Sequence, residues 1–203
     1  INKKEWNVVA STPKIYDIVF ISYNEINANE NYQKLLDKFK NVYRVDGITG
    51  IHQAHIEAAK QATTNMFWVI DADAILENDF NLDYHIPTYD INANKSVHVW
   101  RSRNPVNGLE YGYGGVKLLP TKLTLGMDIT NPDMTTSISE SFIPVDIVAN
   151  ITSFNTDPFS TWKSAFRECV KLSSKIIIGQ NDTETENRLK IWCTIGADKP
   201  FGT

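Results

Sequence analysis

The alternation of strand-like and helix-like segments over residues 16–71 is the feature that most constrains the fold of this chain. Short apolar runs rich in β-branched residues lie at 16–22, 41–46 and 66–70, and between them apolar residues recur at helical spacing. This order predicts parallel strands with helices covering both faces. We therefore expect an α/β fold with a mostly parallel central sheet flanked by helices.

The second half of the chain carries less regular signals. Strands are expected at 96–100 and, interrupted by glycines, at 111–119. Residues 155–173 are typical of a helix, with Asp157 as N-cap and Pro158 at the first helical position. Its apolar stripe comprises Trp162, Phe166, Cys169 and Val170.

Composition excludes several classes of protein. With 20 basic and 24 acidic residues the formal net charge is −4, so the chain lacks a globally basic surface for gripping nucleic acid. No apolar run approaches the roughly 20 residues that span a bilayer. Cys169 and Cys193 have no zinc-site spacing, which favours a reducing, cytoplasmic compartment.

Polar residues follow the strands of the first half. In parallel sheets, ligands bind beyond the carboxyl ends of the strands. Three clusters fall there: Ser22-Tyr23-Asn24, Asp46 and Asp71-Ala72-Asp73. The carboxylates of Asp71 and Asp73 are oxygen ligands of the kind that Mg²⁺ or Mn²⁺ prefers, although an ordinary surface turn also explains such a pair.

These residues carry a family resemblance. Residues 18–76 resemble the nucleotide-binding half of family 2-like, GT-A type glycosyltransferases: 20–25 resemble their first strand and uridine-contacting loop, and 50–63 the helix before their DxD strand. The chain is also similar to glycosyltransferase-like proteins of large tailed, T4-like phages, notably at 99–108 and 162–169.

The resemblance implies a domain organisation and a donor. It implies one GT-A-like domain over 1–203, with a nucleotide-binding half at about 15–76 and an acceptor and catalytic half at about 96–180. The chain starts at Ile1 without a Met, so a piece of a longer polypeptide is an equal expectation. The donor would be a nucleotide-sugar, most simply a UDP-sugar, in the host cytoplasm if a phage encodes the chain.

The resemblance also implies roles for individual residues. Tyr23 would flank the nucleobase and Asp46 would accept from its ring N–H, with the other donor contacts from Ser22, Asn24, Ala72, Gly114 and Gly115. Mn²⁺ or Mg²⁺ at Asp71 and Asp73 would neutralise the departing diphosphate. The chain departs from the family where Gly47 follows Asp46 directly and at His52 and His55.

Several residues have two interpretations. Asp157 is the candidate base for an inverting transfer, or only a helix cap. Asp128 and Asp133 are rival bases, although the Asn-Pro-Asp sequence at 131–133 is also typical of an ordinary turn. Gly114 and Gly115 line a cleft or form a bulge. The histidines are expected to have a hydrogen-bonding or polar-face role, or to complete a metal site. Arg101 and Arg103 are expected to be solvated or to contact a phosphate or a DNA backbone.

Three functions follow from these observations. The first is an enzyme that moves a sugar to a glycan or to a hydroxymethylated DNA base, which would have to be flipped out. The second is a nucleotidyltransferase, although Ser22-Tyr23-Asn24-Glu25 lacks the Gly-rich basic loop of that class. The third is a non-catalytic carbohydrate-binding or virion-associated module. The sequence sets no oligomeric state.

Overall fold

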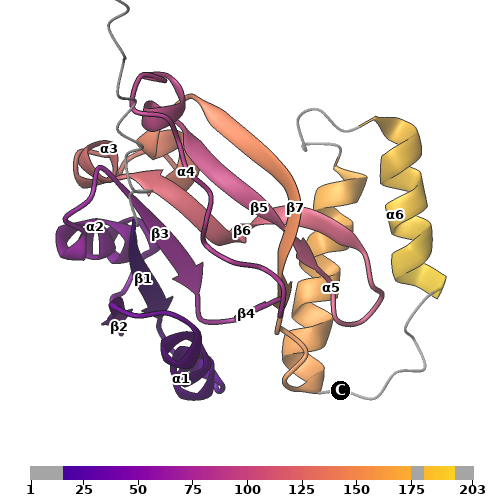
Figure 1. Ribbon diagram of the computed structural model, residues 1–203. Coiled ribbons are helices and arrows are strands. Elements are labelled where there is room, and N and C mark those ends of the chain that lie inside the picture. Colours follow the sequence, from indigo (N-terminus) through magenta and orange to yellow (C-terminus); the bar gives the residue numbers. More distant parts are fainter. Residues whose placement is uncertain (1–15, 175–180, 195–203) are drawn as a thin grey trace, which may run out of the picture.

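One sheet organises the part of the chain that the computed structural model describes, residues 16–174 and 181–194. Its seven strands lie in the order β2-β1-β3-β6-β5-β7-β4 (Figure 1). The strands are β1 (Asp17–Ser22), β2 (Val42–Asp46), β3 (Met66–Asp71), β4 (Ala74–Leu76), β5 (Val97–Arg103), β6 (Glu110–Pro120) and β7 (Phe142–Thr152).

Helices connect and cover these strands. They are α1 (Ala28–Lys38), α2 (Ile51–Gln61), the 3₁₀ turn η1 (Ala93–Lys95), α3 (Thr121–Leu125), α4 (Met134–Ile138), α5 (Pro158–Ser173) and α6 (Asp182–Thr194). Figure 1 shows α5 and α6 side by side at one end of the sheet. Within the described ranges, no helix has the length and apolarity needed to cross a membrane.

Strand direction separates the two halves of the chain. β1 runs parallel to β2 and β3, as the alternation of segments predicts. β6 runs antiparallel to β3 and β5, β7 is parallel to β5, and β4 is antiparallel to β7. The α/β fold is thus confirmed, with its parallel core in the first half and a mixed arrangement beyond it.

Each face of the sheet has its own apolar layer, because side chains alternate along a strand. On one face, Phe20, Trp68 and Trp100 pack against α1 and the segment around Phe80, and the rings of Trp68 and Trp100 lie 4.6 Å apart. The opposite face packs against α2, α3 and α4. Both layers are continuous across β1, β3, β5 and β6 and hold these strands rigidly beneath the site.

Two features were not predicted from the sequence. β7 is an 11-residue strand whose outer half is largely exposed, and β4 is a short strand that pairs with it. The stripe predicted on α5 exists, but Trp162, Phe166 and Val170 face solvent. The second half of the chain therefore leaves apolar side chains uncovered where the sequence suggests a packed helix face.

Trp68 gives a test of this core. Its side chain is fully buried and its indole N–H has no hydrogen-bond partner among the described residues. We expect Trp68→Ala to lower the free energy of unfolding by about 3–5 kcal/mol through the cavity it leaves. Trp68→Phe should cost much less, because it removes the unsatisfied donor while keeping an aromatic ring. Urea denaturation checks both, and equal losses would contradict this account.

Candidate functional site

Two adjoining cavities lie beyond the carboxyl ends of β1 and β3. The first cavity, about 270 Å³, is bounded by the glycines of β6, the end of β5, α5 and α6. The second cavity, about 400 Å³, lies between the β1–α1 loop, the turn after β3 and the N-terminal half of α5. Both contain Asp73, Phe154, Ser164 and Arg167. The cleft thus lies where the strand order predicts, with Asp73 at the junction of its two parts.

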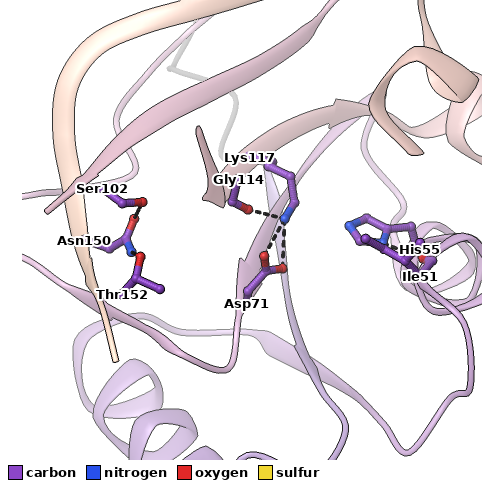
Figure 2. A network of polar contacts seen from close by, with 8 residues as sticks. All are labelled: Ile51, His55, Asp71, Ser102, Gly114, Lys117, Asn150 and Thr152. Atoms are coloured by element: carbon purple, nitrogen blue, oxygen red, sulfur yellow. Dashed lines mark hydrogen bonds and ion pairs between the residues drawn. The ribbon is translucent and has the colours of Figure 1, made fainter. Parts of the chain in front are cut away.

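Asp71 has a partner that the sequence did not suggest. The ammonium of Lys117, on β6, donates to both carboxylate oxygens of Asp71, at 2.9 and 2.7 Å, and to the carbonyl of Gly114 (Figure 2). The Lys117 side chain is only 4% exposed. Alternation along the strands puts both residues on the α2 face, and this buried cation occupies Asp71 in place of the predicted metal ion.

His55 lies on the same side of the sheet. Its Nδ1 contacts the carbonyl of Ile51, whereas the buried Nε2 has no partner among the described residues (Figure 2). Burial, followed by the nearby charge of Lys117, lowers the pKa of His55 to about 4. The imidazole is therefore neutral at pH 7, so His55 places no second positive charge beside Lys117.

Asp73 is the carboxylate that faces the cleft. Burial, together with the negative charges of Asp71 and Glu25, raises the pKa of Asp73 to about 6, although the positive charge of Lys117 opposes this shift. A carboxylate in this state gains from a nearby cation. A divalent ion at Asp73 would take its other ligands from substrate phosphates and water, whereas Asp71 already has the ammonium of Lys117 as its partner.

The turn that carries Asp73 is fixed through its backbone. Ala72 donates its N–H to Ile21, and its carbonyl accepts from the buried amide of Asn31 at 2.8 Å. The Asp73 carbonyl accepts from the N–H of Ser153 at 2.6 Å. Ala72 lines the second cavity, but its backbone groups are already engaged within the protein.

The residues predicted to contact the base lie near the ends of β1 and β2. Ser22 donates to Asp46 at 2.5 Å, and Arg44 donates to both residues. The Ser22 hydrogen bond, aided by the charge of Arg44, lowers the pKa of Asp46. Tyr23 is half exposed, and Asn24 lines the second cavity. Arg44, which sequence reasoning missed, thus holds Asp46 as a carboxylate.

Gly114 and Gly115 satisfy both interpretations. Pairing of β5 with β6 shifts register beside them, as at a bulge, and both residues line the first cavity. A Cβ on Gly115 would lie 2.8 Å from the amide nitrogen of Asn150. Asn150 is fully buried and accepts from Ser102 at 2.9 Å (Figure 2), so its amide is held in the space that a side chain at Gly115 would need.

Of the three candidate bases, only Asp157 lines one of the two cavities. Asp157 caps α5 by accepting from the N–H and hydroxyl of Ser160, at 2.9 and 2.6 Å, and also lines the second cavity. The Ser160 hydroxyl is the main cause of its lowered pKa. Asp133 caps α4 through the N–H of Thr136 and lines neither cavity, and the carboxylate of Asp128 accepts from Thr130.

The other candidates have structural partners. His98 contacts Tyr84 and the carbonyl of Ala93, and His52 contacts Ser137. Arg101 pairs with Asp146, and Arg103 with Glu77 and Glu110. Over residues 16–174 and 181–194, no three His, Cys, Asp or Glu side chains are grouped as metal ligands. Both cysteines are free thiols.

Comparison with known proteins gives structural neighbours only. No family model and no curated protein matches the sequence. A putative glucose-1-phosphate thymidylyltransferase from Bacillus anthracis is 13% identical, with 66% of this chain and 68% of that one covered and a TM-score of 0.41. 4-Diphosphocytidyl-2C-methyl-D-erythritol synthase from Anaerococcus prevotii is 12% identical, with 75% of this chain and 78% of that one covered and a TM-score of 0.42. HddC from Yersinia pseudotuberculosis is 13% identical, with 75% of this chain and 99% of that one covered and a TM-score of 0.42. All three neighbours are at most 13% identical to this chain, and the similarity concerns the path of the chain alone.

The Lys117–Asp71 pair predicts a pattern of mutant stabilities. Lys117→Met should lower the free energy of unfolding by about 3 kcal/mol, because it leaves the Asp71 carboxylate without its cation. Adding Asp71→Asn should recover part of that loss, since the double variant has no unpaired charge. Chemical denaturation of the two single variants and the double variant checks this, and strictly additive losses would show that the two side chains do not interact.

Asp73 predicts a pH dependence of stability in protein kept free of metal by a chelator. Its pKa is about 6 when folded and 3.8 when unfolded, so the unfolded chain releases this proton at lower pH. The contribution of Asp73 to the free energy of unfolding therefore falls as the pH rises from about 4 to about 6. Asp73→Asn removes this effect, and its advantage over the native protein should grow across that window in urea titrations. Parallel pH profiles would refute the shift.

Proposed function

We propose that this chain transfers a sugar from a nucleoside-diphosphate donor to a hydroxyl acceptor. The observation that carries the proposal is that Asp73 and Arg167 both line the two adjoining cavities at the carboxyl edge of β1 and β3. This edge is where parallel sheets bind nucleotides. A carboxylate that gains from a cation and an exposed guanidinium together suit a group that carries several negative oxygens.

Asp73 and Arg167 are proposed to stabilise the diphosphate as it leaves. As the glycosidic bond breaks, negative charge grows on the departing oxygens, and fixed positive groups at that position stabilise the transition state. Arg167 supplies one such group and makes no ion pair with another described residue. Asp73 would hold a divalent cation, which when bound offsets the remaining charge.

Asp157, which lines the second cavity, is proposed as the general base of the transfer. There it would accept the proton of an acceptor hydroxyl as the sugar passes through an oxocarbenium-like state, as in an inverting transfer. Its lowered pKa makes it a weak base, which suits a transfer in which the acceptor loses its proton late. A glycan or a hydroxymethylated base, flipped out of its strand, is the acceptor class proposed.

Calorimetry with UDP-, GDP- and dTDP-sugars, each with Mn²⁺ and with a chelator, tests the donor site. We expect native protein to bind one of them more tightly with metal, and Asp73→Asn to abolish the metal effect. Arg167→Ala should weaken binding roughly 10- to 150-fold, the loss of a charged hydrogen bond worth about 1.5–3 kcal/mol. Asp37→Asn, on the exposed face of α1, is the matched control and should bind like native protein.

Two outcomes would replace this function. Pyrophosphate release from a nucleoside triphosphate and a sugar phosphate, with no transfer from a nucleotide-sugar, would make the chain a nucleotidyltransferase. Failure to bind any nucleotide-sugar, with or without metal, would leave a non-catalytic module.

A further inference from the structure

Helix α5 exposes a column of apolar side chains along its outer face. The exposed fractions are 65% for Phe159, 59% for Trp162, 57% for Phe166 and 49% for Val170. The rings of Trp162 and Phe166 are 5.5 Å apart and nearly parallel, at 19°. Contiguous exposed aromatic surface of this kind is uncommon on a protein that has no ligand or partner for it.

A column of positive charge lies directly beside the apolar one. Lys163, Arg167 and Lys171 each follow one residue after a member of the apolar column, and all three are exposed. Within the described residues none of them forms an ion pair. From Trp162 onward both columns repeat every four residues, which is about 6 Å along a helix. Neighbouring phosphates of an extended single strand follow one another at a similar spacing.

We propose that this face of α5 binds single-stranded nucleic acid. Bases would stack on Trp162 and Phe166, and the backbone phosphates would lie along Lys163 and Lys171. Aromatic platforms combined with a positive groove are how proteins hold single strands without reading their sequence. The basic column also lines the cleft, so a strand bound here would run past its mouth. As an acceptor site this surface rests on the transferase function proposed above; as a binding surface it does not.

The placement of the charges favours a nucleic acid over other anionic partners. A helix that lies on a membrane has a polar face rich in lysine and arginine opposite its apolar face. On α5 they occupy one flank only, and on the other flank burial, with a smaller effect of the nearby Cys193 of α6, raises the pKa of Cys169. An acidic peptide would use the positive charges but would leave the aromatic rings without flat partners. A single strand uses both columns at once.

Fluorescence anisotropy of a labelled oligodeoxythymidylate at low salt, without any sugar donor, tests the proposal. We expect Trp162→Ala with Phe166→Ala to weaken binding at least about tenfold, because each stacked base is lost. Trp162→Phe with Phe166→Tyr should restore most of the affinity. Lys163→Ala with Lys171→Ala should reduce the slope of log affinity against log salt by about 1.4, or 0.7 for each phosphate contact.

Matched controls make the test specific. Tyr89→Ala removes an exposed aromatic ring, and Lys95→Ala with Lys122→Ala removes two exposed lysines, all away from α5. These variants should bind like native protein, and so should Asp73→Asn, which separates this surface from the donor site. Circular dichroism confirms that each variant is folded.

Three results would overturn the proposal. The first is no binding of the oligonucleotide by native protein. The second is equal affinity in the α5 variants and the controls. The third is equal or tighter binding of anionic phospholipid vesicles or polyglutamate, which would assign the surface to a membrane or an acidic protein.

Discussion

The ion pair between Lys117 and Asp71 determines the character of the cleft. It joins β6 to β3 where the ladder between β5 and β6 loses its register, and it also satisfies the carbonyl of Gly114. A buried ammonium with three acceptors is fully hydrogen-bonded, so Lys117 stays in place. The Asp71 carboxylate is then engaged by this ammonium and is not available to a ligand in the cleft. The cleft is left with Asp73 as the acidic member of the Asp-Ala-Asp turn, and that single group defines where a cation gains most.

Sequence reasoning succeeded where strands are buried on both faces. β1 and β3 are continuous apolar runs because helices cover both sides of them, and such runs are visible without coordinates. β7 gave no comparable signal, since one face of its outer half is exposed, the other is only partly buried, and Pro144 interrupts its pattern. β4 is a strand only because β7 lies beside it, and a pairing between distant segments leaves no periodicity in three residues.

The same distinction holds for the site. Topology alone placed Asp71, Asp73 and Asn24 at one edge of the sheet, and helix-capping chemistry placed Asp157 at the start of α5. The partner of Asp71 was invisible because Lys117 lies 46 residues further along, in a strand where a lone lysine is usually solvated. The outward direction of the α5 stripe was equally hidden, because periodicity shows that a helix has an apolar face but not what covers it.

The hydrogen bond from Ser153 to the carbonyl of Asp73 ties the turn after β3 to the segment that leads into α5. The carboxylate and the helix therefore cannot be repositioned independently, and a ligand that prefers one placement of α5 also selects an orientation of Asp73. Any coupling carried by this contact is reciprocal: a ligand in the cleft would change affinity along the helix by the same factor as the reverse. One short contact between main-chain atoms thus links the turn that carries the carboxylate to the start of the helix beside it.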